Sequence, residues 1–138
     1  MKEYRKTYKP LIGWVIALFA VMLAIAMLPI ENGAMLTRLT LLGMVVMLIA
    51  LMVIVCTGEY VYWINGGPTF EQARDAGSNA RKAYARAHLR AFLWGGAASA
   101  ALMLISAVAR WPIGVDIVGV CLCMIVTAFS TIRIKFQK

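Results

Sequence analysis

The chain has 138 residues, of which 62% are hydrophobic and 14% are charged, and its formal net charge is +8. Soluble domains carry roughly 25% charged residues, so this composition excludes an ordinary soluble globule. The mean hydropathy of +0.80 points the same way. We therefore expect a membrane protein.

The apolar residues are gathered into long blocks. No Asp, Glu, Lys or Arg occurs within 11–30, 39–58 or 91–109, and a fourth block at 113–132 contains only Asp116. About 20 helical residues cross a bilayer, and the blocks lack the alternation of barrel strands. The sequence thus predicts an all-α integral membrane protein, organised as a single four-transmembrane-helix bundle. The predicted spans are at about 11–30, 37–58, 91–109 and 113–132.

The segment at about 65–90, between the second and third spans, has the local signals of helices outside the bilayer. Thr69 and Gln72 have the spacing of a capping box, which predicts a short helix over 70–76. Gly77 can end that helix in the left-handed conformation. Ser78 then predicts the N-cap of a longer, amphipathic helix that runs into the third span.

The basic residues indicate how the spans are oriented. Only Arg38 and Arg110 fall in the short connections after the first and third spans. The other twelve share one side, which the positive-inside rule places in the cytoplasm together with both termini. We therefore expect a multi-pass protein of the plasma or inner membrane. The twelve residues are Lys2, Arg5, Lys6, Lys9, Arg74, Arg81, Lys82, Arg86, Arg90, Arg133, Lys135 and Lys138.

The amphipathic helix predicts a surface that binds anionic lipid or a protein partner. A juxtamembrane Lys or Arg contributes about 1 kcal/mol of attraction to anionic lipid. The charge accompanies membrane spans and no aromatic-rich basic module, so nucleic acid is not an expected partner. The candidate residues for lipid or partner binding are Arg81, Lys82, Tyr84, Arg86, His88 and Arg90.

His88 is the only histidine of the chain, and no Cys, Asp or Glu stands three or four residues after it. One histidine cannot supply bis-histidine haem ligation, and metal sites need several ligands. We interpret His88 as a side chain at the headgroup layer, and we expect no metal or cofactor.

Two carboxylates are the candidate ion or transport residues. Asp116 lies inside a span, where an acid is costly unless it is paired, solvated or functional, and pairing with Arg110 is the simpler alternative. Glu59 begins an amphipathic stretch, 59–64, that could prolong the second helix. A salt bridge from Glu59 to Arg86 or Arg90 is the alternative to a role in gating or ligand coordination.

The third span carries small residues at a spacing of four. Ala91, Gly95 and Ser99 allow another backbone to approach closely, either within the chain or in a second copy. A homo-oligomer or a membrane-protein partner is consistent with either arrangement.

These observations leave two classes of function. No combination of nucleophile, base and orienting group is visible, so an enzyme is not expected. The first class is an oligomeric channel or transporter for an ion or small solute, with Asp116 and Glu59 along the path. The alternative is a non-transporting accessory, scaffolding or lipid-binding subunit that acts through its basic loop. The intramembrane acid favours transport, and the scarcity of polar residues in the spans favours the alternative.

Overall fold

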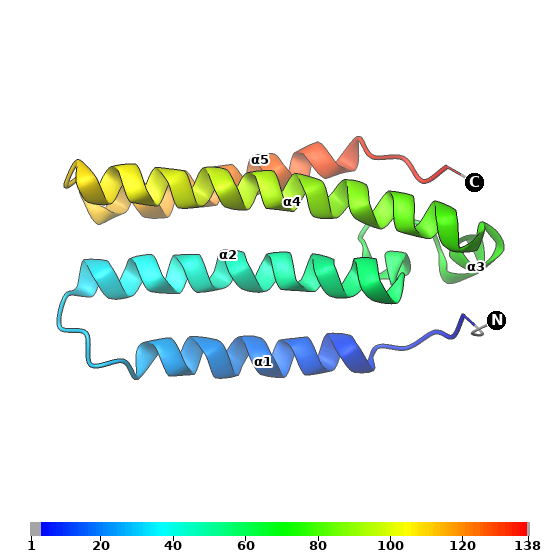
Figure 1. Cartoon of the computed structure of the whole chain (residues 1–138), viewed down its shortest axis with the longest axis horizontal. Helices are drawn as coiled ribbons and strands as arrows, with labels where there is room; N and C mark the ends of the chain where they lie inside the picture. The colour runs from blue at the N-terminus through cyan, green and yellow to red at the C-terminus, as the bar shows by residue number, and fades with distance from the viewer. Residues whose placement is uncertain (1–3, 138) are drawn as a thin grey trace.

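The computed structural model describes residues 4–137, and its regular elements in that range are all helical (Figure 1). Four helices are long and apolar enough to cross a bilayer, which indicates a membrane-spanning protein. Lys2 and Lys138, which entered the charge count, lie outside the described residues. The elements are α1 (Lys9–Ala26), α2 (Gly33–Gly58), the 3₁₀ turn η1 (Val61–Trp63), α3 (Phe70–Asp75), α4 (Gly77–Val108) and α5 (Ile113–Ile132).

The long helices run alternately up and down (Figure 1), and α2, α4 and α5 all contact one another. In the described part of the chain α1 packs against α2 alone, whereas α2 contacts α1, α4 and α5. Both termini lie at the same end as α3. We call this the terminal end, and the opposite end, with the α1–α2 and α4–α5 connections, the hairpin end.

Two consecutive glycines of α4 bring three helices together. A Cβ atom at Gly95 would overlap the side chain of Thr127 on α5, and one at Gly96 would lie 2.6 Å from Cδ1 of Ile49 on α2. Ser99, one turn along from Gly95, is buried and donates its hydroxyl to the Gly95 carbonyl oxygen at 2.9 Å. Gly95, Gly96 and Ser99 therefore serve packing inside the chain.

The first two helices differ from the predicted spans at the hairpin end. α1 already ends at Ala26, because Pro29 has no N–H and disfavours helical geometry in the residue before it. α2 begins at Gly33, earlier than predicted, because Asn32 caps it. The Asn32 side chain accepts a hydrogen bond from the Met35 N–H at 3.1 Å.

The second helix ends where the predicted span does, and the possible continuation over 59–64 is not formed. α2 ends at Gly58, and Glu59 takes the left-handed conformation with φ of 57°. This turn directs the chain into η1 and leaves the Glu59 side chain beside the start of α4. The helix therefore ends because Glu59 is held by partners outside it.

Of the local signals between the second and third spans, the capping box of α3 is confirmed and the N-cap at Ser78 is wrong. Thr69 and Gln72 form the predicted capping box, with bonds of 2.9 and 3.2 Å, and Gly77 has φ of 81°. Ser78, however, is not the N-cap, since α4 begins at Gly77. Its hydroxyl donates instead to the carboxylate of Glu59.

We expect Gly95→Ala to destabilise the bundle, because the new Cβ meets Thr127, whose own hydroxyl is held by the Cys123 carbonyl. Overpacking of this kind costs about 1–3 kcal/mol. Gly13→Ala on α1 is the matched control, since nothing lies within 4 Å of its Cβ position. Thermal unfolding in detergent measures both, and equal stability of the two variants would contradict the close approach.

Candidate functional site

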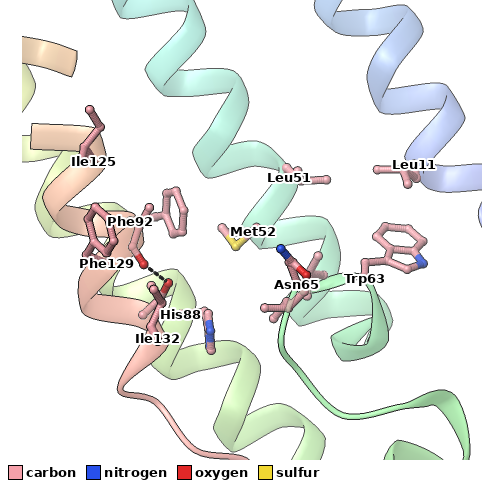
Figure 2. Close-up of a pocket in the computed structure, with 14 residues that line it drawn as sticks. Leu11, Leu51, Met52, Trp63, Asn65, His88, Phe92, Ile125, Phe129 and Ile132 are labelled. Carbon is pink, nitrogen blue, oxygen red and sulfur yellow. Dashed lines mark hydrogen bonds between the residues drawn. The ribbon is translucent and has the colours of Figure 1, made fainter. Parts of the chain in front are cut away.

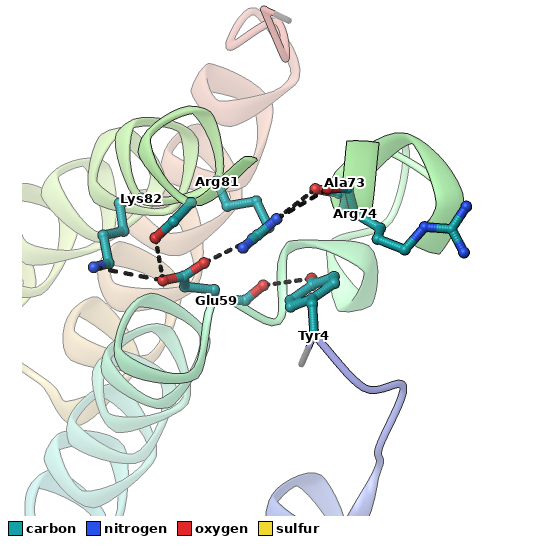
Figure 3. Close-up of polar contacts among 7 residues, drawn as sticks. Tyr4, Glu59, Ala73, Arg74, Arg81 and Lys82 are labelled. Atoms are coloured by element: carbon teal, nitrogen blue, oxygen red, sulfur yellow. Dashed lines mark hydrogen bonds and ion pairs between the residues drawn. The ribbon is translucent and has the colours of Figure 1, made fainter. Parts of the chain in front are cut away.

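Glu59 is the centre of a polar cluster at the terminal end, which we call the Glu59 cluster (Figure 3). One carboxylate oxygen accepts a hydrogen bond from Ser78 Oγ at 2.6 Å and lies 3.5 Å from Lys82 Nζ. The other accepts from Arg81 Nε at 2.7 Å. The cluster comprises Tyr4, Glu59, Ser78, Arg81 and Lys82, and it joins the end of α2 to the first turns of α4.

The predicted partners of Glu59 on α4 are wrong. Arg86 and Arg90 lie farther along the helix and are exposed, whereas Glu59 stands beside the first turns of α4. The prediction placed the acid at the inner end of the second span, as the structure does. Because the left-handed conformation of Glu59 sets its side chain beside the start of α4, its partners come from earlier in α4.

The sequence suggested that Arg81 belongs to an exposed basic surface, but the structure shows that it is buried. It is only 8% exposed, and its Nη1 donates to the Ala73 carbonyl oxygen of α3 at 2.8 Å. Its guanidinium lies 4.0 Å from the centroid of the Tyr4 ring, in a cation–π contact. Arg81 thus connects α2, α3, α4 and the N-terminal segment.

The electrostatics of the Glu59 cluster follow from these contacts. Burial disfavours ionisation of Glu59, but hydrogen bonds from Ser78 and Arg81 and the charges of Arg81 and Lys82 outweigh it, so the pKa of Glu59 is lowered. Burial raises the pKa of Tyr4 to about 12, although the charge of Arg81 opposes the shift. Glu59 is therefore ionised and Tyr4 protonated at neutral pH.

The N-terminal segment before α1 is fastened to the same end. Tyr4 donates its hydroxyl to the Glu59 carbonyl oxygen at 2.7 Å. The Thr7 N–H donates to the Tyr62 hydroxyl at 2.9 Å, and the Thr7 carbonyl accepts from that hydroxyl at 2.8 Å and from Trp63 Nε1 at 3.2 Å. Aromatic rings of Tyr4, Tyr62 and Phe70 pack together here.

Asp116 pairs with Arg38 and not with Arg110, its predicted partner. It is fully buried, and its Oδ2 accepts from Arg38 Nε at 2.9 Å. Arg110 is exposed in the left-handed conformation after α4. Oδ1 of Asp116 and Oγ of Ser106 are the two buried side-chain atoms within residues 4–137 that have no hydrogen-bond partner. The ion pair joins α2 to α5 near the hairpin end.

An apolar cavity of about 510 Å³ lies in the half of the bundle nearer the terminal end (Figure 2). All four long helices and the η1 region contribute to its walls. Its polar lining side chains are His88, Asn65 and Thr131. The apolar lining residues are Leu11, Leu51, Met52, Val55, Trp63, Ile64, Phe92, Ile125, Ala128, Phe129 and Ile132.

The structure places His88 in the wall of this cavity and not on an exposed surface of the helix. His88 is only 3% exposed, and its Nδ1 lies 3.1 Å from the Tyr84 carbonyl oxygen. Tyr84 is buried as well, with its ring against His88 and Phe136. The sequence did not reveal the cavity, because its walls come from segments that are far apart in the chain.

The remaining basic residues of the amphipathic helix form one exposed row. Lys82, Arg86 and Arg90 follow one another at intervals of four on α4, and Trp94, 73% exposed, continues the row. α4 has 32 residues, so its length of about 48 Å exceeds a hydrocarbon core of about 30 Å. We call Lys82, Arg86 and Arg90 the basic row. Ala91, beside it, is half-buried.

The described part of the chain holds no group of three or more His, Cys, Asp or Glu residues that could bind a metal ion. No family model matches the chain, and comparisons with curated proteins and with solved structures give no match either. Any function must therefore be argued from the geometry of the Glu59 cluster, the Arg38–Asp116 ion pair, the cavity and the basic row.

We expect Glu59→Gln to lower stability in a pH-dependent way. Because the folded pKa lies below the ordinary value of 4.5, the carboxylate stabilises the fold fully above that value and loses its effect as the pH falls through the folded pKa. At pH 7 the loss should be about 1.5–3 kcal/mol, the range for hydrogen bonds to a charged group. Thermal unfolding of both proteins measured across the acid range tests this.

The control is Glu71→Gln, because Glu71 is an exposed acid in the first turn of α3. It should unfold like the wild type throughout. If the deficit of Glu59→Gln is the same at neutral and at strongly acidic pH, the ionised carboxylate is not what holds the cluster together.

Proposed function

We propose that the protein is a non-transporting membrane subunit that binds a lipid-like molecule between its helices. The observation that carries this proposal is the cavity of about 510 Å³, lined mainly by apolar side chains. Small-molecule sites in proteins have volumes of roughly 300–1,000 Å³ and combine apolar walls with few polar groups. Phe129 and Ile132, which are 66% and 73% exposed, give the cavity a side that faces the surroundings of the bundle. An acyl chain could enter from the bilayer on that side.

The basic row supports the inference that the terminal end lies at an anionic membrane surface. Lys82, Arg86 and Arg90 are exposed where α4 extends beyond the length of a span, and Trp94 follows at the depth where aromatic residues gather. We infer that the terminal end faces the cytoplasm in a plasma or inner membrane. The row then holds anionic headgroups or an acidic surface of another membrane protein, while the cavity holds a separate molecule.

The distribution of polar side chains argues against a permeation path through one copy. Thr40, Ser99 and Thr127 lie within the long helices, and each donates its hydroxyl to a carbonyl oxygen of its own helix. The buried ion pairs lie near opposite ends of α2, at Arg38 and at Glu59. The middle of the bundle therefore offers few groups that could replace the hydration shell of an ion.

Filling the cavity should remove the bound molecule without unfolding the protein. Ala128→Trp places an indole in the cavity. We would release the protein from bilayers of phosphatidylcholine, phosphatidylglycerol and diacylglycerol, and we expect native mass spectrometry to show loss of a lipid adduct that the wild type retains. Ala101→Trp is the control, since Ala101 is exposed on α4 and does not line the cavity. Equal lipid retention by both variants, or none by the wild type, would contradict the proposal.

A second candidate function, transport by a homo-oligomer, is favoured by Asp116. Its Oδ1 is buried and accepts no hydrogen bond within the described chain, and intramembrane acids of this kind often mark ion or proton paths. A path would need several copies, because a single copy has few polar groups at mid-depth. Glu59 is less suited to a moving ion, since both of its carboxylate oxygens are engaged.

Transport predicts that Asp116→Asn abolishes flux. We would reconstitute the protein in liposomes and follow protons and K⁺ with entrapped dyes, with Asp75→Asn as the control because Asp75 is an exposed acid. Flux that exceeds empty liposomes, survives Asp75→Asn and is lost in Asp116→Asn would support this candidate. No flux in the wild type, or unchanged flux in Asp116→Asn, would remove it.

A further inference from the structure

The polar groups inside the cavity differ in what they can offer a ligand. Asn65 is exposed, whereas His88 is buried in the wall (Figure 2). The Tyr84 carbonyl oxygen, 3.1 Å from His88 Nδ1, can only accept a hydrogen bond, so Nδ1 carries the proton. In the neutral imidazole Nε2 is then a hydrogen-bond acceptor. No residue of the described chain donates to it.

The other polar side chains of the walls have already used their donors. The Thr131 hydroxyl donates to the Ala128 carbonyl oxygen at 2.6 Å, and Trp63 Nε1 donates to the Thr7 carbonyl oxygen at 3.2 Å. What remains inside is the Nε2 lone pair of His88 and the lone pairs of Thr131 Oγ1. The interior side chains thus present acceptors, and the free amide donor, Asn65, stands at the exposed edge.

This arrangement selects among lipid-like molecules. A carboxylate or phosphate can only accept hydrogen bonds, and its charge would be costly among apolar walls. An ammonium group can donate, but it carries the same charge penalty. An uncharged hydroxyl donates one hydrogen bond and also accepts, so it matches His88 while its oxygen remains free for Asn65. An apolar body attached to the hydroxyl fits the remaining walls.

We propose that the cavity binds a neutral lipid alcohol, whose hydroxyl donates a hydrogen bond to Nε2 of His88. This inference rests on the proposed lipid-binding function and specifies the ligand of that site. His88 would then be the residue that distinguishes an alcohol from a hydrocarbon chain of equal length. The basic row lies on an exposed face of α4, whereas His88 is buried, so headgroup binding there is separate.

The test uses three photoreactive probes of equal chain length in phosphatidylcholine nanodiscs: hexadecanol, its methyl ether and hexadecane, each with a diazirine at the same carbon. The ether keeps the oxygen but lacks the donor. We expect hexadecanol to label cavity residues about threefold to tenfold more than the other two, as one additional hydrogen bond implies. Peptide mapping by mass spectrometry locates the label. This comparison needs no variant protein.

A variant then assigns the effect to one residue. His88→Phe keeps an aromatic ring and removes Nε2, so it should reduce hexadecanol labelling to the level of the ether and leave hexadecane labelling unchanged. Tyr84→Phe is the control, because Tyr84 touches the His88 ring but does not line the cavity. Thermal unfolding verifies that both variants are folded.

The outcomes separate this inference from the function on which it rests. Equal labelling by all three probes, or hexadecanol labelling that His88→Phe leaves unchanged, would overturn the assignment of the alcohol while lipid binding stands. If none of the probes labels the cavity, the proposed lipid-binding function fails as well.

Discussion

The close approach of α4 to two neighbours at Gly95 and Gly96 is the constraint on which the rest of the bundle depends. A backbone without Cβ atoms can lie against α2 on one side and α5 on the other at the same level. One turn farther toward the terminal end, Phe92 and then His88 stand on α4 in place of glycine, and the cavity lies there. The close packing at Gly95 and Gly96 and the cavity beside Phe92 and His88 therefore both follow from the sequence of this part of α4.

Charge pairs set the register of α2 against the helices beside it. Apolar surfaces of Leu, Val and Met have no strong preference for one axial position. Arg38 near one end of α2 pairs with α5, and Glu59 at the other end pairs with α4. Leaving any of these charges without its partner in a low-dielectric environment would be costly, so the pairs favour one axial position over its alternatives.

Local signals in the sequence predicted much of the fold, and long-range pairings were out of reach. Long apolar blocks predicted four spans, and the spacing of Thr69 and Gln72 predicted α3, because both depend on residues close in the chain. The partner of Asp116 is 78 residues away, and choosing Arg38 over Arg110 requires knowing which helices touch. The cavity could not be predicted for the same reason, because its walls come from distant segments. The N-cap at Asn32 is a local signal, so the sequence alone could have predicted it.

The contacts of Tyr4 at the terminal end affect the order in which the chain folds during synthesis and the choice of terminus for a tag. The ring of Tyr4 packs on Arg81, which is synthesised much later, so this end closes only after α4 has begun to form. The Tyr4 hydroxyl donates a hydrogen bond to the Glu59 carbonyl oxygen, and the Tyr4 ring stacks on Phe70. Any tag or fusion partner joined ahead of Tyr4 must therefore leave from a packed junction of three helices. One joined after Gln137, which is exposed, extends from a segment beyond the last helix.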